Sequence, residues 1–287
     1  MNGVINFLKP PGMSSGGAVV FLRHLLNAKT GHAGTLDPGA CGVLPICVGK
    51  ATRISAYLMG SKKEYIAEIT FGASTDTGDS YGKIITKSNE QPPQPTQVEE
   101  ALKRFSGSVT QLTPAYSAAK QNGVKRYQLA RRGVALEPKP REIEIFETEY
   151  LGATSMNSHR VRVVCGKGTY IRTLCEDIGQ ALGLPSYMSF LARTYCAGMR
   201  IEDAYTADEL QVNGAAQSAL LPLDGLLTML PRIEAETDQR RLLCCGAAVG
   251  YDGGQMETAR IYAGGKLLGI GSAGNGVMKI STLLVDE

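Results

Sequence analysis

Residues 31–38 read GHAGTLDP and place one carboxylate, Asp37, among two glycines and a proline. Gly34 can adopt a positive φ and lets other groups approach the main chain closely. Pro38 has a fixed φ and no N–H, and it restricts the backbone of the residue before it, which is Asp37 itself. We therefore predict a rigid loop that displays a single acidic side chain, an arrangement suited to a catalytic carboxylate.

Further short motifs lie on both sides of this loop. GVLP at 42–45 and GKAT at 49–52 follow it directly. The others are KPPGMSS at 9–15, SKKEY at 61–65, TDTGD at 75–79 with Gly82, GTYIRTL at 168–174 and LART at 191–194. In order and spacing, the set resembles the motifs of the bacterial tRNA pseudouridine-55 synthase family, over roughly residues 1–210.

Hydrophobic periodicity predicts strands that pair as hairpins and do not alternate regularly with helices. Strands are expected at Val4–Leu8, Tyr65–Phe71, Glu142–Tyr150 and Arg160–Cys165. Helices are expected from a cap at Ser15 to about Asn27, from a capping box at Thr96 to about Phe105, over Tyr170–Leu182 and after a capping box at Thr206. This pattern predicts an α+β fold with a mixed, largely antiparallel sheet.

The C-terminal residues differ in character from the rest. Short strands are expected at Ala259–Tyr262, Lys266–Ile270 and Val277–Leu284, separated by glycine turns that favour a small β-barrel. Position and pattern resemble the PUA domain that ends many RNA-modifying enzymes, and a plain structural cap is the alternative. We expect a catalytic domain over residues 1–225 and a short PUA-like RNA-binding domain over residues 226–287.

One motif in that C-terminal part is misleading. Residues 269–274 satisfy G-x-G-x-x-G, which in a dinucleotide-binding fold opens a helix and is followed about 20 residues later by an acid. Because only 13 residues follow Gly274, there is no room for that unit. We therefore reject a nucleotide-cofactor site here.

Composition excludes several classes of protein. The chain has 287 residues and a net charge of only +3, so no global polybasic character indicates a nucleic-acid partner. No run of about 18 apolar residues is present, so no membrane span is expected. The first residues lack a signal-peptide pattern, and the seven cysteines, in no C-x-x-C spacing, suit a reduced, cytoplasmic protein. Three histidines without ligand spacing predict no metal site.

Charge is unevenly distributed. Residues 120–141 contain seven basic side chains and one acid, Glu137, for a net +6. The basic residues are Lys120, Lys125, Arg126, Arg131, Arg132, Lys139 and Arg141. Such a run is often a solvated face, but the resembled family carries here, at about 111–141, an insertion that clamps RNA. The resemblance thus implies RNA contacts by Lys63, Lys120, Lys125, Arg126, Arg131 and Arg132.

The resemblance implies an isomerisation that needs neither cofactor nor metal. The bond between ribose C1′ and uracil N1 breaks, and the base rotates and rejoins through C5. Asp37 matches the catalytic aspartate of the family. It could attack C1′, act as a base at C2′ or add to C6, and the sequence does not choose among these routes.

Other family positions surround this acid. Arg172 matches the arginine that pairs with the aspartate, and a guanidinium can hold a carboxylate through two hydrogen bonds and keep it ionised. Tyr170, which helps to shape the pocket, would share a face with Arg172 in a strand but diverge from it at a helix start. Tyr65 matches a tyrosine that stacks on the uracil and could assist removal of the C5 proton. Leu191 matches an apolar residue that packs on the other face of the base.

His32 matches a histidine that takes part in base extrusion by bracing the space that flipped nucleotides leave. The resemblance therefore implies an enzyme that flips a T-loop uridine out of tRNA and converts it to pseudouridine. The partner expected is the T-arm of tRNA, with no membrane and no metal, and the protein is expected to be a monomer. A non-catalytic tRNA-folding chaperone that uses the same surface is the alternative, although it would not need Asp37, Arg172 and Tyr65 together.

Overall fold

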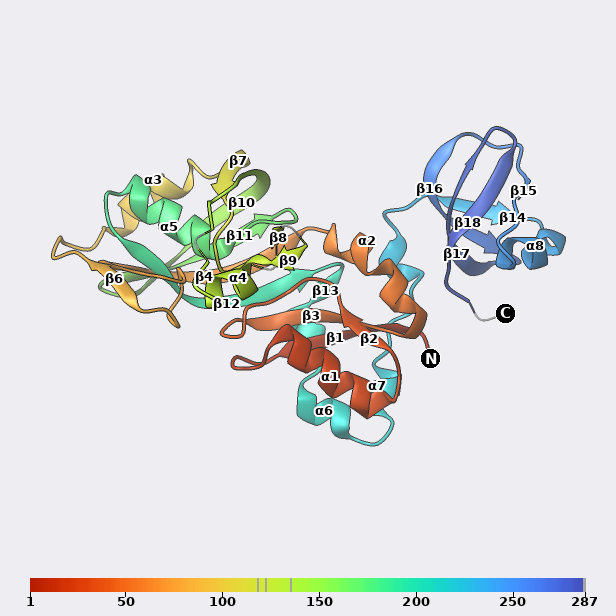
Figure 1. The fold of residues 1–287 in the computed structure, drawn as a ribbon, viewed down its shortest axis with the longest axis horizontal. Coiled ribbons are helices and arrows are strands. Elements are labelled where there is room, and N and C mark those ends of the chain that lie inside the picture. The colour runs from red at the N-terminus through yellow and green to blue at the C-terminus, as the bar shows by residue number, and fades with distance from the viewer. Residues whose placement is uncertain (118, 122, 135, 286–287) are drawn as a thin grey trace.

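The computed structural model describes residues 1–117, 119–121, 123–134 and 136–285, and the side chains at 120, 125 and 131 lie outside this description. Two sheets organise the chain (Figure 1). The larger sheet and its helices occupy most of the molecule, and a smaller, curled C-terminal sheet stands at one end. The predicted α+β class, with a mixed and largely antiparallel sheet, is confirmed.

The large sheet has nine strands, and an inner strand, β12, lies between β3 and β4. Its order is β1 (Gly3–Lys9), β3 (Cys41–Val48), β12 (Ser186–Cys196), β4 (Lys63–Phe71), β11 (Ser158–Cys165), β10 (Pro140–Ser155) and β7 (Gly107–Leu112), with β2 (Thr30–His32) on β3 and β13 (Met199–Arg200) on β12. The pair β12–β3 is parallel, whereas β12–β4 and β1–β3 are antiparallel. The four strands predicted in this region are present.

Helices cover both faces of the large sheet. On one face lie α1 (Ser15–Leu26), α3 (Pro95–Leu102) and α5 (Ile171–Ala181), whose apolar side chains share one core with the sheet. On the other face, the turn η1 (Gly49–Ile54) and α2 (Ser55–Met59) pack in a second core. The remaining short elements of this region are β5 (Ala73–Thr75), β6 (Ile84–Lys87), η2 (Ile201–Asp203), α6 (Ala207–Gln211), α7 (Ala215–Ser218) and η3 (Gly225–Leu227).

Two predicted helix caps are wrong by one or two residues. The cap of α1 is Ser14, whose hydroxyl accepts from the Gly17 N–H at 2.9 Å, and Ser15 is the first helical residue. The helix α3 begins at Pro95 with Gln94 as its cap, because the Gln97 side chain accepts the Gln94 N–H at 2.7 Å. The capping box at Thr206 is confirmed.

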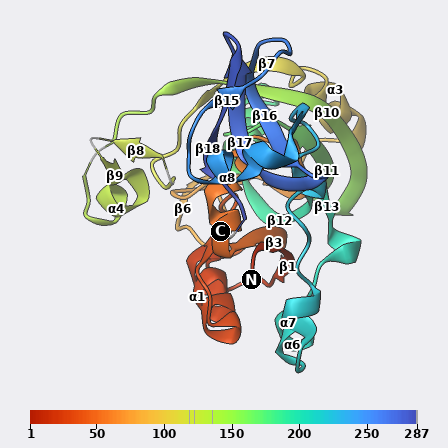
Figure 2. The same ribbon diagram turned by 90° about the vertical axis from the view of Figure 1, so that its right-hand side faces the viewer.

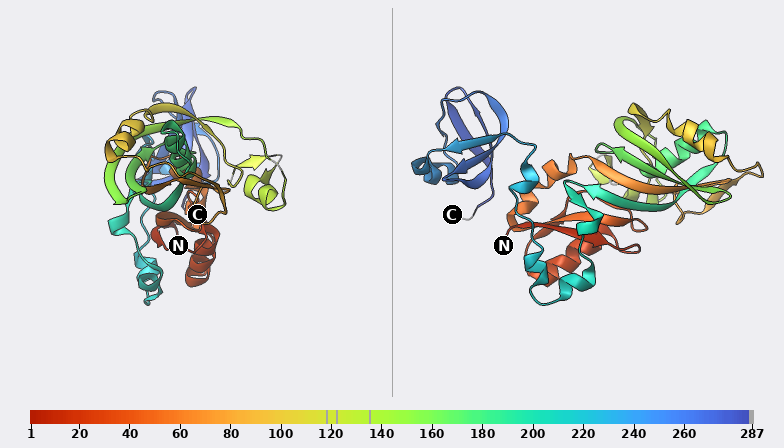
Figure 3. Two further views of the ribbon diagram at one scale, coloured as in Figure 1. Left: turned by 90° about the vertical axis from the view of Figure 1, so that its left-hand side faces the viewer. Right: turned by 180° about the vertical axis from the view of Figure 1, so that it is seen from behind.

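The predicted insertion lies between β7 and β10 and stands away from the body of the molecule (Figure 2, Figure 3). It contains β8 (Lys120–Gln121), β9 (Val124–Lys125) and α4 (Arg126–Arg131). Arg126 is 2% exposed and donates to Gln121 Oε1 at 2.7 Å and to the Glu137 carbonyl at 3.0 Å. It therefore holds the insertion together internally, and the RNA contact expected of Arg126 remains a prediction.

The smaller sheet has the order β14 (Arg232–Ala235), β16 (Met256–Ala263), β17 (Lys266–Gly274), β18 (Val277–Leu283) and β15 (Val249–Gly250), with η4 (Thr237–Gln239) and α8 (Arg240–Cys244) beside it. The three predicted strands are present in this PUA-like unit. The G-x-G-x-x-G run lies in β17, where a Cβ at Gly269 would meet the Thr282 carbonyl oxygen at 2.2 Å. These glycines therefore allow the close approach of β17 and β18.

The two sheets are in contact. Ile270 and Leu284 of the C-terminal part share a buried cluster with Ile54, Leu223 and Leu227. The Arg53 guanidinium also donates to the Leu283 carbonyl at 2.7 Å. The PUA-like unit is thus fixed against η1, on the side of the sheet opposite α1.

The buried cysteines behave as predicted. Cys47, Cys165 and Cys175 are buried with free thiols, and burial raises the pKa of Cys165 to about 11. Within the described residues, no helix is long and apolar enough to cross a membrane.

Asp177 gives helix α5 a pH-dependent stability. Burial raises the pKa of this carboxyl to about 6, from 3.8. Below about pH 3.8 the carboxyl is protonated in both the folded and unfolded states, and above about pH 6 the folded state holds a desolvated charge. The stability contributed by the protonated group is therefore lost as pH rises from about 3.8 to about 6.

We predict that Asp177→Asn raises the Tm at pH 7.5 and that this advantage shrinks as the pH is lowered to 4. A gain of about 1 kcal/mol corresponds to about 2–4 °C in a chain of this size. The matched control is Asp252→Asn at an exposed position, for which no change is expected. Calorimetry at the two pH values decides, and an equal effect of Asp177→Asn at both would contradict the assignment.

Candidate active site

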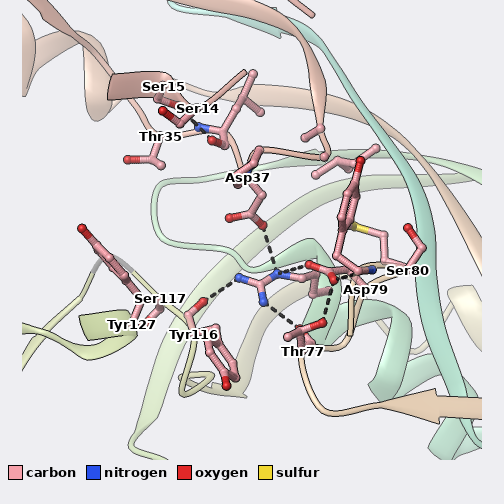
Figure 4. Close-up of a pocket in the computed structure, with 18 of the residues that line it drawn as sticks. Ser14, Ser15, Thr35, Asp37, Thr77, Asp79, Ser80, Tyr116, Ser117 and Tyr127 are labelled. Atoms are coloured by element: carbon pink, nitrogen blue, oxygen red, sulfur yellow. Dashed lines mark hydrogen bonds and ion pairs between the residues drawn. The ribbon is translucent and has the colours of Figure 1, made fainter. Parts of the chain in front are cut away.

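A cavity of about 640 Å³ opens where α5, the β2–β3 loop, the β5–β6 turn and the insertion meet. This volume is typical of a small-molecule or nucleotide pocket. Asp37 lies in it together with Thr77, Asp79 and Tyr116, which come from distant parts of the chain (Figure 4). The loop predicted to display one carboxylate therefore does so at the edge of a cavity.

An ion pair lies in this cavity. The Nε atom of Arg172 is 3.0 Å from Oδ2 of Asp37, with the arginine side chain 7% exposed and the aspartate side chain 38% exposed. The pair of Arg172 with Asp37 is present, and it forms through one nitrogen, Nε, instead of the two hydrogen bonds that a guanidinium can make. The other guanidinium nitrogens donate to the carbonyl oxygens of Thr77, at 2.7 Å, and Tyr116, at 2.6 Å.

These two carbonyl bonds decide what the ion pair can do. A guanidinium held at three nitrogens has little freedom to turn, so it fixes the position of the carboxylate that it pairs with. Burial of the arginine strengthens the attraction because water screens it poorly. One oxygen of the half-exposed Asp37 is therefore held while the carboxylate faces the cavity.

Asp79 is a cavity residue that was not predicted from the sequence. Its Oδ2 lies 3.9 Å from Arg172 Nε, and its Oδ1 accepts from the Thr77 hydroxyl at 2.6 Å and from the Tyr81 N–H at 3.0 Å. The signal for it is the TDTGD motif, which places two aspartates, Asp76 and Asp79, in one short turn. Asp79 adds a second negative charge beside the guanidinium.

A buried hydroxyl anchors the loop before Asp37. Ser15 is 3% exposed, and its Oγ donates to the Leu36 carbonyl at 2.8 Å and accepts from the Leu36 N–H at 2.9 Å. One side chain on α1 thus satisfies both backbone groups of the residue that precedes the acid. The Ser15 hydroxyl is therefore used by the loop, and the helix cap is provided by the hydroxyl of Ser14.

A buried ammonium anchors the loop after Asp37. Lys9 is fully buried at the end of β1, and its Nζ donates to the Pro38 carbonyl at 3.2 Å and the Met13 carbonyl at 2.7 Å. Burial lowers the pKa of Lys9 to about 8. The Gly12 N–H also donates to the Pro38 carbonyl, at 2.8 Å.

Arg193, in the LART motif of β12, supports the start of the same loop. It is fully buried and donates to the Val43 carbonyl at 2.8 Å and the Gly34 carbonyl at 3.0 Å. A Cβ at Gly42 would lie 2.2 Å from the Arg193 carbonyl oxygen, so the parallel pairing of β3 with β12 requires a glycine there. Three buried side chains thus hold the loop from three sides.

His32 and Leu191 line the cavity, as predicted. His32 is half-buried on β2, and Leu191, on β12, is 7% exposed. Two other predicted residues, Tyr65 and Tyr170, are not among the described residues that line it. Tyr170 is the N-cap residue of α5, so it diverges from Arg172, as expected for a helix start.

Tyr65 lies behind the cavity wall. It is 7% exposed on β4, opposite Arg193 of β12. Burial raises the pKa of its hydroxyl to about 12, and the nearby Arg193 cation opposes this rise. The hydroxyl is therefore protonated at neutral pH, which disfavours a role as a free base.

Of the six predicted RNA-binding cations, Arg126 is described above, and Lys63 and Arg132 differ in their exposure. Lys63 is 7% exposed, and its ammonium donates to the carbonyls of Met59, at 2.9 Å, and Ser61, at 2.7 Å, so the group for which an RNA contact was predicted is engaged within the protein. Arg132 is exposed, as an RNA contact requires. The side chains of Lys120, Lys125 and Arg131 lie outside the described part of the chain.

The insertion contributes to the cavity as well as to the surface. Tyr116, Ser117 and Tyr127 line it, and the Tyr116 carbonyl accepts from Arg172. Within the described residues, no group of three or more His, Cys, Asp or Glu side chains could hold a metal ion. The polar side chains described at the cavity are thus two carboxylates, the Arg172 guanidinium, the His32 imidazole and several hydroxyls.

Two family models match consecutive parts of the chain. The N-terminal domain of the TruB family pseudouridylate synthases matches residues 23–171, and the C-terminal domain of tRNA pseudouridylate synthase B matches residues 172–228. The tRNA pseudouridine synthase B of Alkaliphilus oremlandii is 46% identical over 227 residues, which are 78% of this chain and 75% of that protein. That of Dechloromonas aromatica is 40% identical over 279 residues, or 96% of this chain and 93% of that protein.

Solved structures share the fold. A chain in the crystal structure of a Cbf5-Nop10-Gar1 complex is 26% identical, with a TM-score of 0.73, over 98% of this chain and 79% of that one. A chain in the structure of an H/ACA RNP bound to a substrate RNA containing 2'-deoxyuridine has a TM-score of 0.74 at 23% identity, over 99% of this chain and 85% of that one.

We predict that Ser15→Ala loosens the Asp37 loop specifically. It leaves the buried Leu36 N–H without its acceptor, a loss of about 1–3 kcal/mol. Ser14→Ala is the matched control, because it removes a helix cap of similar value, about 1 kcal/mol, without touching the loop. Both variants should lower the Tm, but only Ser15→Ala should speed amide hydrogen exchange in a peptide covering residues 34–38. Unchanged exchange there would show that Ser15 does not hold the loop.

Proposed function

The chain belongs to the TruB family of pseudouridylate synthases, and we propose that it converts the uridine at position 55 in the T-loop of tRNA to pseudouridine. The observation that carries this proposal is the Asp37 carboxylate, held by Arg172 at 3.0 Å at the edge of a cavity large enough for a nucleotide. The enzyme is an isomerase.

The reaction rearranges one nucleotide without an added group. The C1′–N1 bond breaks, the detached uracil turns, and a C1′–C5 bond forms. The C5 proton leaves and N1 gains a proton, so atoms and electrons balance and no redox change occurs. What the protein must supply is a carboxylate beside C1′, a pocket that retains the uracil, and a way to take the base out of its stack.

Asp37 supplies the carboxylate. Its half-exposed position lets it approach the sugar, and Arg172 holds one of its oxygens, Oδ2. Attack on C1′ and proton removal from C2′ both place a carboxylate at this side of the ribose. Asp79 lies 3.9 Å from the same Arg172 nitrogen, Nε, so two acids face the guanidinium at this atom.

The other proposed site residues surround the base. Leu191 provides the apolar face on which the uracil packs, and His32 braces the space that the extruded nucleotides leave. Tyr65 is also proposed to stack on the uracil; because it does not line the cavity here, this contact requires the wall at β4 to shift when the base enters. Its raised pKa of about 12 disfavours removal of the C5 proton by its hydroxyl. Tyr170 shapes the pocket indirectly, since the Gln111 side chain holds its N–H at 2.8 Å and so fixes the start of α5.

The RNA surface extends from the cavity over the insertion. Arg132 and the other cations of residues 120–141 are proposed to bind phosphates of the T-arm, and the PUA-like unit over residues 226–287 is proposed as a second RNA contact. We propose that the enzyme acts as a monomer in the cytoplasm. A folding chaperone without catalysis is not favoured, because a binder would need no carboxylate held beside a nucleotide-sized cavity.

We predict that Asp37→Asn abolishes conversion and spares binding. Purified protein and unmodified tRNA are incubated without metal or nucleotide, and pseudouridine at the T-loop uridine is measured by chemical derivatisation and primer extension. Wild type should convert the uridine fully, and Asp37→Asn should lower the rate about 10⁴-fold or more, because the amide is neither nucleophile nor base.

The control for this experiment is Asp252→Asn, an exposed aspartate of the C-terminal part, which should convert as wild type does. Binding of tRNA to Asp37→Asn should stay within about threefold of wild type. A converting Asp37→Asn variant would refute the assigned role, and a wild type that binds tRNA without converting it would support the chaperone.

A further inference from the structure

An exposed aromatic side chain stands at the cavity. Tyr81 lies in the turn between β5 and β6, lines the cavity and is 70% exposed. A tyrosine ring offers a large apolar surface at a low entropic cost of ordering, so it suits a contact surface when it is held in place. Two independent features hold it.

The first feature is the contact between the Tyr81 ring and Gly39, where a side chain would collide with the ring. A Cβ built on Gly39 would lie 2.1 Å from Cε2 and 2.8 Å from Cδ2 of the Tyr81 ring. Gly39 is not among the glycines with a positive φ, so the constraint at this position is room for the ring rather than backbone conformation. The ring therefore packs directly on the backbone of the Asp37 loop, two residues after the acid.

The second feature is the backbone of the turn. The Tyr81 N–H donates to Asp79 Oδ1 at 3.0 Å, and the other oxygen of that carboxylate lies 3.9 Å from Arg172 Nε. The next residue, Gly82, is also confined, since a Cβ there would lie 2.3 Å from the Thr77 hydroxyl oxygen. The ring is thus tied to the ion pair through Asp79 and to the acid loop through Gly39.

We propose that Tyr81 is a stacking platform for the base of a nucleotide adjacent to the target uridine. This inference rests on the proposed function and concerns how its RNA substrate is held. The target base must reach Asp37 inside the cavity, whereas most of the Tyr81 surface faces outward. Single-stranded bases that leave their stack gain about 1–3 kcal/mol each by stacking on an aromatic side chain.

The base that stacks on Tyr81 is expected to be a neighbour of the target uridine, because proteins recognise RNA loops largely through unpaired bases. Extrusion of one uridine also unstacks its neighbour, and unpaired bases are held mainly by aromatic rings. Tyr81 would stabilise the opened loop at the place where the target base enters. Its role is therefore in substrate affinity, with the chemistry left to Asp37.

The test compares Tyr81→Ala, Tyr81→Leu and Tyr81→Phe on a T-arm stem-loop RNA. Stacking predicts that the alanine and leucine variants raise KM about tenfold, a loss within the range of one base–aromatic stack. The phenylalanine variant should restore most of the affinity, and the single-turnover rate at saturating RNA should fall less than threefold in all three. Tyr205→Ala, which removes a 40% exposed tyrosine outside the cavity, is the matched control and should behave as wild type.

The partner base is identified with RNAs that carry an abasic nucleotide on either side of the target uridine. One of the two RNAs should bind wild type about tenfold more weakly, and Tyr81→Ala should lose nothing further on that RNA. A leucine variant as tight as wild type, or losses that multiply on both abasic RNAs, would overturn the proposal. A rate loss with unchanged KM would overturn it too, since it would make Tyr81 a support for the Asp37 loop.

The outcome is separable from that of the proposed function. Affinity of the same RNAs is also measured by fluorescence anisotropy, which needs no turnover. If wild type formed no pseudouridine, the proposed function would fail, while the affinity series would still accept or reject stacking by Tyr81.

Discussion

Arg172 Nε and Asp37 Oδ2 lie 3.0 Å apart, and each side of this ion pair is held by a different part of the fold. The guanidinium is fixed by carbonyls from the β5–β6 turn and from the insertion. The carboxylate is fixed through its loop by Ser15 on α1, Lys9 on β1 and Arg193 on β12. Because a buried arginine without its partner would be strongly destabilising, the pair also couples these distant elements to one another.

The elements that could be predicted from sequence are those with a local signal. The strand β4 alternates buried and half-buried residues, and the capping box at Thr206 is complete within four residues. The loop around Asp37 could be predicted because a proline restricts its backbone and glycines allow conformations that other residues disfavour. The pair with Arg172 could not be derived from local pattern, since 135 positions separate the two residues, and it came from the family resemblance alone.

The burial of two cations has no signal in the local sequence pattern. Lys63 and Arg126 are charged and therefore expected at the surface, yet nearby backbone carbonyls accept their hydrogen bonds and allow them to be buried. The pairing of Gly39 with Tyr81 was equally hidden. Neither residue has a local signature, and their contact exists because β5 and β6 bring residue 81 over the Asp37 loop. Tertiary contacts of this kind decide affinity and positioning, whereas the local motif decides which acid is presented.

The most direct test of the central claim is the single-turnover rate and tRNA affinity of Arg172→Lys measured on the same preparation. Lysine keeps the positive charge but cannot donate at once to Asp37, Thr77 and Tyr116 from a planar group. If the arginine acts by holding Asp37 in place, the rate falls about 100-fold, as expected for a displaced reacting group, while the Kd for tRNA stays within about threefold. A Kd that rises with no change in rate would contradict the account, because Arg172 would then be an RNA anchor and the ion pair incidental.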